Sequence, residues 1–248
     1  MRVHGTLNRV LQHLLRVDVT AVALIHGWGG SFSATWQRNG FTALLEDSGA
    51  SVIGIDLLGH GDAPKPHDPD AYGDLTTRIV EALPDEPVDA VGFSLGAMTL
   101  LRAAIDNPTR FNRLILAGVG SNIFKRDEAG TRQIIEGLDL VAGGGDPSTL
   151  DNTVRLFAQY AQQPGNDLGA LNAVMKRPPA PLLTAEQMAT VTCPVMVIIG
   201  DQDFTYPGDA LAAAFPNGQC TTLKGVDHFA TTDDFGFFDA ALEFLDAV

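Results

Sequence analysis

Six short, mostly apolar runs recur along the chain, separated by longer segments with helical patterns, and they constrain the fold more than any other feature. The runs are Thr20–Ile25, Ser51–Asp56, Val88–Phe93, Arg113–Ala117, Pro194–Ile199 and Gln219–Leu223, of which the last is the weakest. Near-continuous apolar runs of this length are typical of strands buried on both faces of a parallel sheet. Parallel neighbours need long crossover connections, and the helical segments supply them. The sequence therefore predicts an α/β fold.

The predicted helices between and after these strands are Ala34–Ser48, Leu75–Leu83, Leu95–Asp106 and Phe235–Ala247. The third is expected to end at Asn107-Pro108, because proline cannot continue a helix.

One stretch of about 75 residues, between Leu116 and Pro194, has no strand pattern and is too long for a plain loop. Three capping signals predict helices in it: Asp146-Pro147 for a helix through Gln162, Asn166-Asp167 for one to Lys176, and a capping box at Thr184–Gln187. We expect residues 121–183 to form a helical insertion over one end of the sheet, with 1–120 and 184–248 forming the core.

Charge and composition exclude several classes of function. Sixteen Lys and Arg against thirty Asp and Glu give a net charge of −14, without the basic run that a nucleic-acid binder needs. No apolar run reaches the roughly 20 residues of a membrane span, and charged residues interrupt the N-terminal segment, which argues against a signal peptide. We expect a cytoplasmic protein with a small-molecule substrate, no nucleic-acid partner and no membrane. Oligomeric state is not predicted.

The strongest local motif is Gly92-Phe93-Ser94-Leu95-Gly96, which lies between a predicted strand and a predicted helix. This strand–turn–helix context is the one that a Gly-x-Ser-x-Gly nucleophile requires. The serine would stand on a tight turn with strained torsions, and larger residues in place of either glycine would collide with the adjoining elements. The alternative is a glycine-rich turn with an incidental serine.

A nucleophilic serine needs a base and an acid that orients the base. We predict His228 as the base, because it follows the last strand and so lies at the same sheet edge as Ser94. The acid should follow another strand, where both Asp201 and Asp203 are possible, and we favour Asp203. Asp227, beside the base, could perturb the histidine pKa or compete to orient it. The other histidines are either in glycine-rich turns, with expected structural hydrogen bonds (His26, His60), or without supporting context (His4, His13, His67).

The oxyanion of an acyl-transfer intermediate needs two backbone N–H donors. We expect these donors to be the N–H of Leu95, directly after the nucleophile, and that of Trp28 in the glycine-rich loop 26–30. A phosphate cradle is the alternative for this loop. Its spacing matches neither a P-loop nor a dinucleotide fingerprint.

The order of these motifs resembles the α/β-hydrolase superfamily, in the branch of small soluble esterases, cofactor-free perhydrolases and carbon–carbon bond hydrolases. The matching pieces are HGWGG at 26–30, DLLGHG at 56–61, GFSLG at 92–96, GDQD at 200–203 and DHF at 227–229. The resemblance implies a mostly parallel twisted sheet, helices on both faces and a helical cap inserted after the sixth strand. It also implies the same roles for Ser94, Asp203, His228, Trp28 and Leu95.

The sequence departs from the family in two places. Leu7–Val17 fits the usual opening strands unevenly, and Asp227 stands where the family often has glycine. Ser94 argues against the family's dehalogenases and epoxide hydrolases, which carry aspartate as the nucleophile.

The predicted activity is that of a serine hydrolase cleaving a small neutral or apolar ester through an acyl-enzyme. Carbon–carbon bond hydrolysis, lactone, amide or thioester cleavage and perhydrolysis use the same machinery and stay open. So do a lyase or acyltransferase, and a receptor-like module with vestigial turnover. We expect Trp28, Phe124, Phe157 and Tyr160 in the substrate pocket. Other apolar residues of the insertion either join them or form its own core (Ile123, Ile134, Leu138, Leu156, Leu171, Met175).

Neither a metal nor an organic cofactor is predicted, since no ligand cluster has suitable spacing. Two cysteines, Cys193 and Cys220, form neither a disulfide scaffold nor a metal cluster and are expected to be buried thiols.

Overall fold

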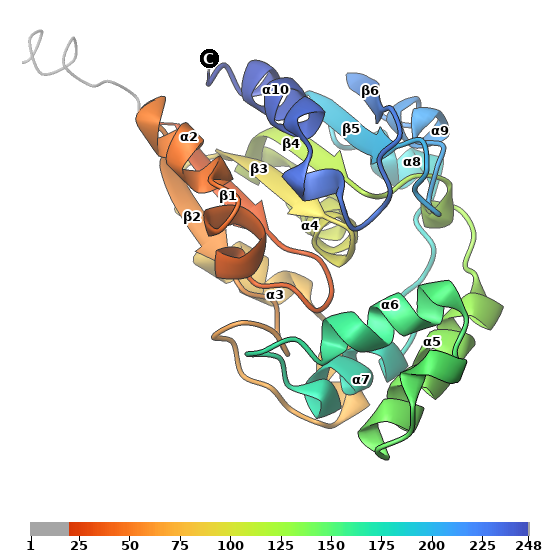
Figure 1. The fold of residues 1–248 in the computed structure, drawn as a ribbon. Coiled ribbons are helices and arrows are strands. Elements are labelled where there is room, and N and C mark those ends of the chain that lie inside the picture. Colours follow the sequence, from red (N-terminus) through yellow and green to blue (C-terminus); the bar gives the residue numbers. More distant parts are fainter. Residues whose placement is uncertain (1–19, 248) are drawn as a thin grey trace, which may run out of the picture.

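A single sheet of six parallel strands runs through the computed structural model, which describes residues 20–247 (Figure 1). The strands are β1 (Ala21–Ile25), β2 (Ser51–Ile55), β3 (Val88–Phe93), β4 (Phe111–Ala117), β5 (Val195–Gly200) and β6 (Gly218–Leu223). Their order is β2-β1-β3-β4-β5-β6, and every neighbouring pair is parallel. The predicted α/β class is confirmed. The expectations for Leu7–Val17 and for the absence of a signal peptide fall outside the described residues.

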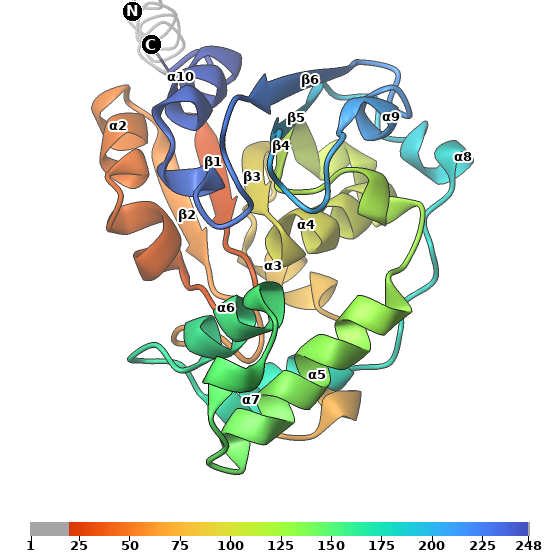
Figure 2. The same ribbon diagram turned by 45° about the vertical axis from the view of Figure 1, so that its right-hand side comes forward.

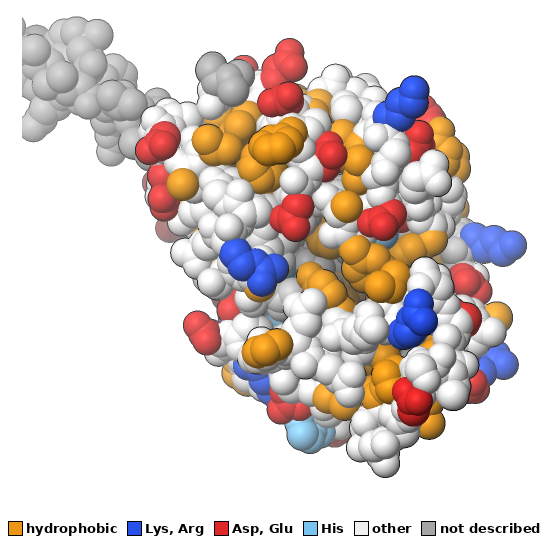
Figure 3. Space-filling view, viewed as in Figure 1, with side chains coloured by type: hydrophobic (Ala, Val, Ile, Leu, Met, Phe, Trp, Pro, Cys, Tyr) orange, Lys and Arg blue, Asp and Glu red, His pale blue; other side chains and the backbone are white. Residues whose placement is uncertain are grey.

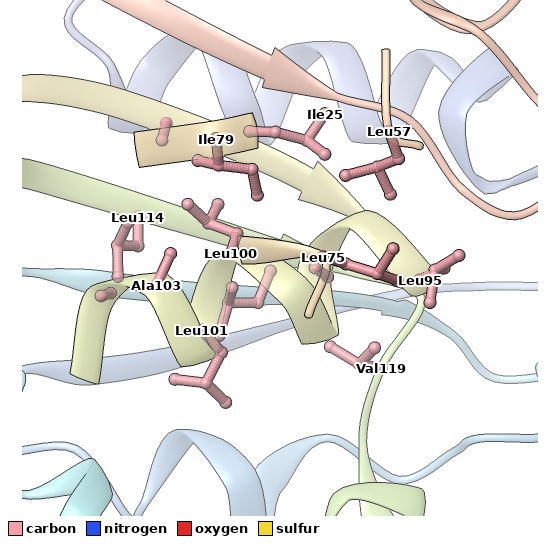
Figure 4. Packing of buried hydrophobic residues seen from close by; sticks show 14 of the residues in the cluster. Ile25, Leu57, Leu75, Ile79, Leu95, Leu100, Leu101, Ala103, Leu114 and Val119 are labelled. Atoms are coloured by element: carbon pink, nitrogen blue, oxygen red, sulfur yellow. The ribbon is translucent and has the colours of Figure 1, made fainter. Parts of the chain in front are cut away.

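The central strands β1, β3, β4 and β5 are buried on both faces, because their alternate side chains enter two separate hydrophobic clusters. The edge strands β2 and β6 are partly exposed. In β4, Leu114 and Leu116 pack on one side, while Ile115 and Ala117 pack on the other. The first side is covered by α3 (Thr76–Ala82) and α4 (Leu95–Asp106), and Figure 4 shows α4 packed against the strands. The second side is covered by α2 (Phe41–Asp47) and α10 (Phe235–Phe244). The predicted near-continuous apolar strands are explained by this double burial.

The predicted helix Ala34–Ser48 is wrong as one element. The chain forms a π-helical turn, η1 (Ser33–Gln37), and then α2, with Gly40 between them at a φ of +87°. A left-handed residue cannot continue a right-handed helix, so the apolar pattern spans two elements. Shorter elements complete the core: η2 (Pro69–Tyr72), η3 (Pro108–Arg110), α8 (Ala185–Met188), α9 (Asp209–Ala212) and η6 (Thr231–Asp233).

The long segment between β4 and β5 is helical. It contains η4 (Ser121–Ile123), α5 (Glu128–Ala142), η5 (Pro147–Thr149), α6 (Asn152–Ala161) and α7 (Leu168–Lys176). Figures 1 and 2 both show α5, α6 and α7 grouped together beyond the carboxyl ends of the central strands. Helix α5 contacts both α6 and α7. In the described sheet, counted from Ala21, this insertion follows the fourth strand. The count of six that the resemblance implies includes opening strands expected around Leu7–Val17, which lie outside the described residues.

Two details of the insertion differ from the prediction. Asp146 caps only η5, because Leu150 has an extended backbone (φ −80°, ψ 153°), and Asp151 caps a new helix, α6. The long helix α5 was not predicted, and its Gly130 and Gly137 lower the intrinsic helix propensity. Packing compensates at Gly137, where an added Cβ would come within 2.3 Å of the Val154 side chain. Tertiary contact has therefore overridden local propensity.

Acidic side chains are scattered over the face shown in Figure 3, where apolar side chains gather in the middle. From Thr20 to Ala247, the chain contains no helix that combines the length and the apolarity needed to cross a bilayer. Within the same range, no three His, Cys, Asp or Glu side chains are grouped so that they could hold a metal ion. Cys193 and Cys220 are free and only half-buried, and burial raises the pKa of Cys193 to about 11.

Candidate active site

Ser94 occupies a strained turn between β3 and α4. Its φ of +51° and ψ of −114° lie outside the regions that residues with a side chain normally adopt. The flanking glycines are sterically required: a Cβ on Gly92 would come 2.7 Å from the Ala97 Cα, and one on Gly96 would come 2.3 Å from the His26 carbonyl oxygen. The turn places the serine at the N-terminus of α4, where the helix dipole favours negative charge.

Three side chains from different loops form a hydrogen-bonded chain at this turn. Ser94 Oγ lies 2.9 Å from His228 Nε2, and His228 Nδ1 lies 2.8 Å from Asp203 Oδ2. His228 and Asp203 are each 5% exposed. The other carboxylate oxygen, Asp203 Oδ1, accepts hydrogen bonds from the N–H and the hydroxyl of Thr205, both at 2.8 Å. Because the carboxylate accepts a hydrogen bond from the Nδ1–H group, Nε2 is left unprotonated and can accept the serine proton.

The structure separates the acidic residues that the sequence left open. Asp201 Oδ1 accepts from the Gly225 N–H at 2.7 Å, and Asp227 Oδ1 accepts from the Ala230 N–H at 2.9 Å. Both carboxylates therefore stabilise local turns, while Asp203 is the one hydrogen-bonded to His228.

The glycine-rich loop 26–30 lies against the nucleophile. A Cβ on Gly27 would come 2.8 Å from the Phe93 ring and 3.3 Å from Ser94 Cβ, so only glycine allows this approach. The loop follows β1, whose neighbours in the sheet are β2 and β3, so it lies beside Ser94 where the strand order reverses. Among the described residues, neither the Trp28 N–H nor the Leu95 N–H donates to a backbone or side-chain acceptor. Both predicted donors are therefore available to a bound group.

A small aromatic cavity of about 30 Å³ opens beside Ser94. It is lined by Trp28, Phe93, Ser94, Phe157, Tyr160, His228, Phe229 and Thr232. Rings from the insertion meet rings from the core here: Phe157 of α6 lies 5.4 Å from Trp28 and 5.6 Å from Phe229, between ring centroids. Burial raises the pKa of the Tyr160 phenol, which keeps this hydroxyl protonated.

The prediction for Phe124 is wrong, because this side chain is 38% exposed and does not line the cavity. It follows η4, outside the part of the insertion that faces Ser94. Of the insertion's apolar residues, only Phe157 and Tyr160 line the cavity. Leu138 and Leu171 are each 1% exposed and belong to a hydrophobic core cluster.

Sequence reasoning missed four residues around the site. Phe93, Phe229 and Thr232 line the cavity, and the Phe204 ring lies 4.3 Å from the His228 ring while 57% exposed. The signal was present, since Phe93, Phe204 and Phe229 each directly follow or precede a predicted catalytic residue. Strand pattern alone does not show which way such a ring points.

His26 and His60 form a buried pair beneath the site, with ring centroids 5.0 Å apart. His26 Nε2 accepts from the Leu57 N–H, so Nδ1 carries the proton and donates to the Gly27 carbonyl. His60 Nδ1 bonds the Leu58 carbonyl, and its Nε2 is buried without a partner. Burial lowers the pKa of His26, and burial together with His26 lowers the pKa of His60 to about 3. Both are structural groups, and they are neutral at pH 7.

We expect this pair to make the protein acid-sensitive. Below the ordinary histidine pKa of 6.5, the unfolded chain binds a proton at His60 that the folded chain takes up only near pH 3. The contribution of the neutral His60 to the unfolding free energy is therefore fully present above pH 6.5 and is lost progressively as the pH falls toward 3. Between pH 7 and pH 5, His60 alone should remove about 2 kcal/mol of unfolding free energy. Urea unfolding at pH 7 and pH 5 measures this change. We expect His60→Gln to lose less unfolding free energy than the wild type between the two pH values, and equal losses would contradict a neutral buried His60.

Comparison with known proteins places the chain in a family. An uncharacterized protein of Mycobacterium bovis is 29% identical over 91% of this chain and 75% of its own length. A pimeloyl-(acyl-carrier protein) methyl ester esterase of Proteus mirabilis is 24% identical over 90% of each chain. The crystal structure of a bromoperoxidase from Bacillus anthracis shares the fold, with a TM-score of 0.69, 23% identity and 92% of each chain covered. Residues 22–246 match the model of the alpha/beta hydrolase family, and the chain therefore belongs to that family.

Proposed function

We propose that this protein is a serine hydrolase that cleaves small neutral or apolar esters through an acyl-enzyme. The observation that carries the proposal is the hydrogen-bonded chain from Ser94 through His228 to Asp203, built on a strained turn. Strain of this kind is maintained where it serves a site, and the buried carboxylate fixes the histidine tautomer that a base needs.

In the proposed reaction, Ser94 Oγ attacks the ester carbonyl carbon while His228 Nε2 takes the hydroxyl proton. The tetrahedral oxyanion accepts hydrogen bonds from the N–H groups of Trp28 and Leu95. The C–O bond then breaks as the imidazolium returns its proton to the leaving alcohol. Water attacks the acyl-enzyme with His228 again as base, which releases the acid and restores Ser94.

The cavity supports a small substrate. Its volume of about 30 Å³ holds roughly two water molecules. A short acyl group fits this space among five aromatic rings, while a longer chain requires the rings of α6 to move. Among residues 20–247, no Lys, Arg, Asp or Glu lines the cavity, so a charged acyl group would lose its hydration without gaining a partner there. Residues 121–183 act in this proposal as a cap that supplies Phe157 and Tyr160.

Intact-mass labelling with a fluorophosphonate tests the proposed function. We expect one adduct on the wild type, none on Ser94→Ala, and labelling at least about 100-fold slower on His228→Ala, because the serine loses its base. Thermal unfolding of each variant controls for folding. A well-folded wild type that forms no adduct would overturn the proposal, and the cavity would then be tested as a binding site by thermal shift with a ligand panel.

A further inference from the structure

The loop that carries the predicted oxyanion donor is tied to the helical insertion at two points. The Trp28 indole Nε1 donates to the Leu171 carbonyl in α7 at 3.1 Å. The Asn166 side-chain amide, from the connection between α6 and α7, donates to the Gly29 carbonyl at 2.8 Å and to the Tyr160 carbonyl at 3.0 Å. One amide group therefore joins the loop to the C-terminal end of α6.

The loop also fits tightly beneath the insertion. Gly29 has a φ of +74°, and a Cβ on it would come 2.6 Å from the Tyr160 ring. The ring thus lies directly on the loop backbone. Any shift of α6 toward the core would push on Gly29, and any shift away would stretch the bonds from Asn166.

The core holds mainly the first half of this loop. The Gly27 carbonyl accepts from the Gly30 N–H at 3.1 Å and from the buried His26 Nδ1 at 2.7 Å. The Gly29 carbonyl has Asn166 as its partner among the described residues. Asn166 is not used to cap α7, because Asp167 Oδ1 does so by accepting from the Ala170 N–H. Both hydrogens of the Asn166 amide are therefore committed to the two carbonyls.

We propose that Asn166 is a positioning residue that fixes the oxyanion loop from the insertion, so that the Trp28 N–H is aligned only while α6 and α7 are seated on the core. The inference rests on the proposed function and deepens it. Releasing the Gly29 carbonyl frees the Gly29–Gly30 peptide to rotate, and this rotation is transmitted through the torsions of Gly29 to Trp28. A misplacement of about 1 Å at a reacting group can cost about 100-fold in rate. Asn166 does not line the cavity, so ground-state binding should be spared.

The test compares Asn166→Ala and Asn166→Asp with the matched control Asn152→Ala. The Asp variant keeps the shape but directs a carboxylate at two carbonyl oxygens, so it separates hydrogen bonding from packing and carries the test if the Ala variant unfolds. Asn152 is an exposed asparagine at the start of α6, and its side-chain oxygen accepts from Arg155 at 2.8 Å. The readouts are kcat and KM for p-nitrophenyl acetate, and hydrogen–deuterium exchange of residues 26–31.

We expect both Asn166 variants to lose 10- to 100-fold in kcat with KM changed by less than about twofold, and the 26–31 amides to exchange at least about fivefold faster. Asn152→Ala should match the wild type in both. Unchanged kcat, a loss confined to KM, or unchanged loop exchange would overturn the inference. Fluorophosphonate labelling of the wild type is run in parallel. If the wild type does not label, the proposed function fails and the exchange of 26–31 alone decides whether Asn166 positions the loop.

Discussion

We expect Asp203→Asn to lower kcat for p-nitrophenyl acetate by about 10⁴-fold while the protein stays folded. Thr205 determines this result. Its N–H and hydroxyl both donate to the Asp203 Oδ1 position, so an asparagine there places its oxygen toward Thr205 and its NH₂ toward His228. The histidine must then accept at Nδ1 and carry its proton on Nε2. A protonated Nε2 cannot take the proton of Ser94, so the base is lost without loss of the side-chain shape.

Asp201→Asn is the matched control, two residues away on the same loop. Its carboxylate accepts from the Gly225 N–H and does not contact His228, so we expect kcat to stay within about threefold of the wild type. Steady-state kinetics on both variants, with thermal unfolding to verify folding, decides between the two aspartates. An Asp203→Asn enzyme with wild-type kcat, or a large loss in Asp201→Asn alone, would contradict the proposed triad.

The second large effect is on stability, at Gly96. Its Cβ would come 2.3 Å from the His26 carbonyl oxygen and 2.6 Å from that of Ile25. Both are backbone atoms of β1 and its following loop, so no side chain can rotate away and α4 must separate from the sheet. We expect Gly96→Ala to lower the unfolding free energy by about 3 kcal/mol or more and Tm by roughly 6–12 °C, measured by urea and thermal unfolding.

Gly73→Ala provides the comparison for this effect. Gly73 has an ordinary φ of −60°, and its Cβ would meet only the Asp70 carbonyl oxygen at 3.6 Å. We expect its unfolding free energy to stay within about 0.5 kcal/mol of the wild type. Failure of Gly96→Ala to accumulate as folded protein would agree with the expected clash. If Gly96→Ala and Gly73→Ala had the same unfolding free energy, the result would contradict the close approach of α4 to β1.

Periodicity and local chemistry are why much of this molecule could be predicted from its sequence. Strands buried on both faces leave near-continuous apolar runs. The glycines around the nucleophilic serine follow from the local sterics of a strand–helix junction, so they can be recognised without knowing the tertiary contacts. Chain order and the rule that parallel strands end at one sheet edge also brought His228 and Asp203 to the predicted site. Local signals also predicted the helix that ends at Lys176 and the capping box at Thr184–Gln187. The prediction failed in the first part of the insertion, where α5 contains glycines and where Asp146 and Asp151 are equally good caps. Short-range signals there do not distinguish one helix from two.

What the sequence by itself determined is therefore the α/β class, the nucleophile turn and the residue types of the site. The tertiary structure alone decided which of three nearby carboxylates meets His228, because this depends on which turn each aspartate stabilises. It also decided that Phe157 and Tyr160 face Ser94 while Phe124 faces outward, and that Asn166 bonds the loop at Gly29. These contacts join segments that are far apart in the chain, with 137 positions between Gly29 and Asn166. Their geometry follows from how the helices pack on the sheet. Apolar periodicity shows which face of a helix is buried, but it does not show against which partner or at what angle that face packs.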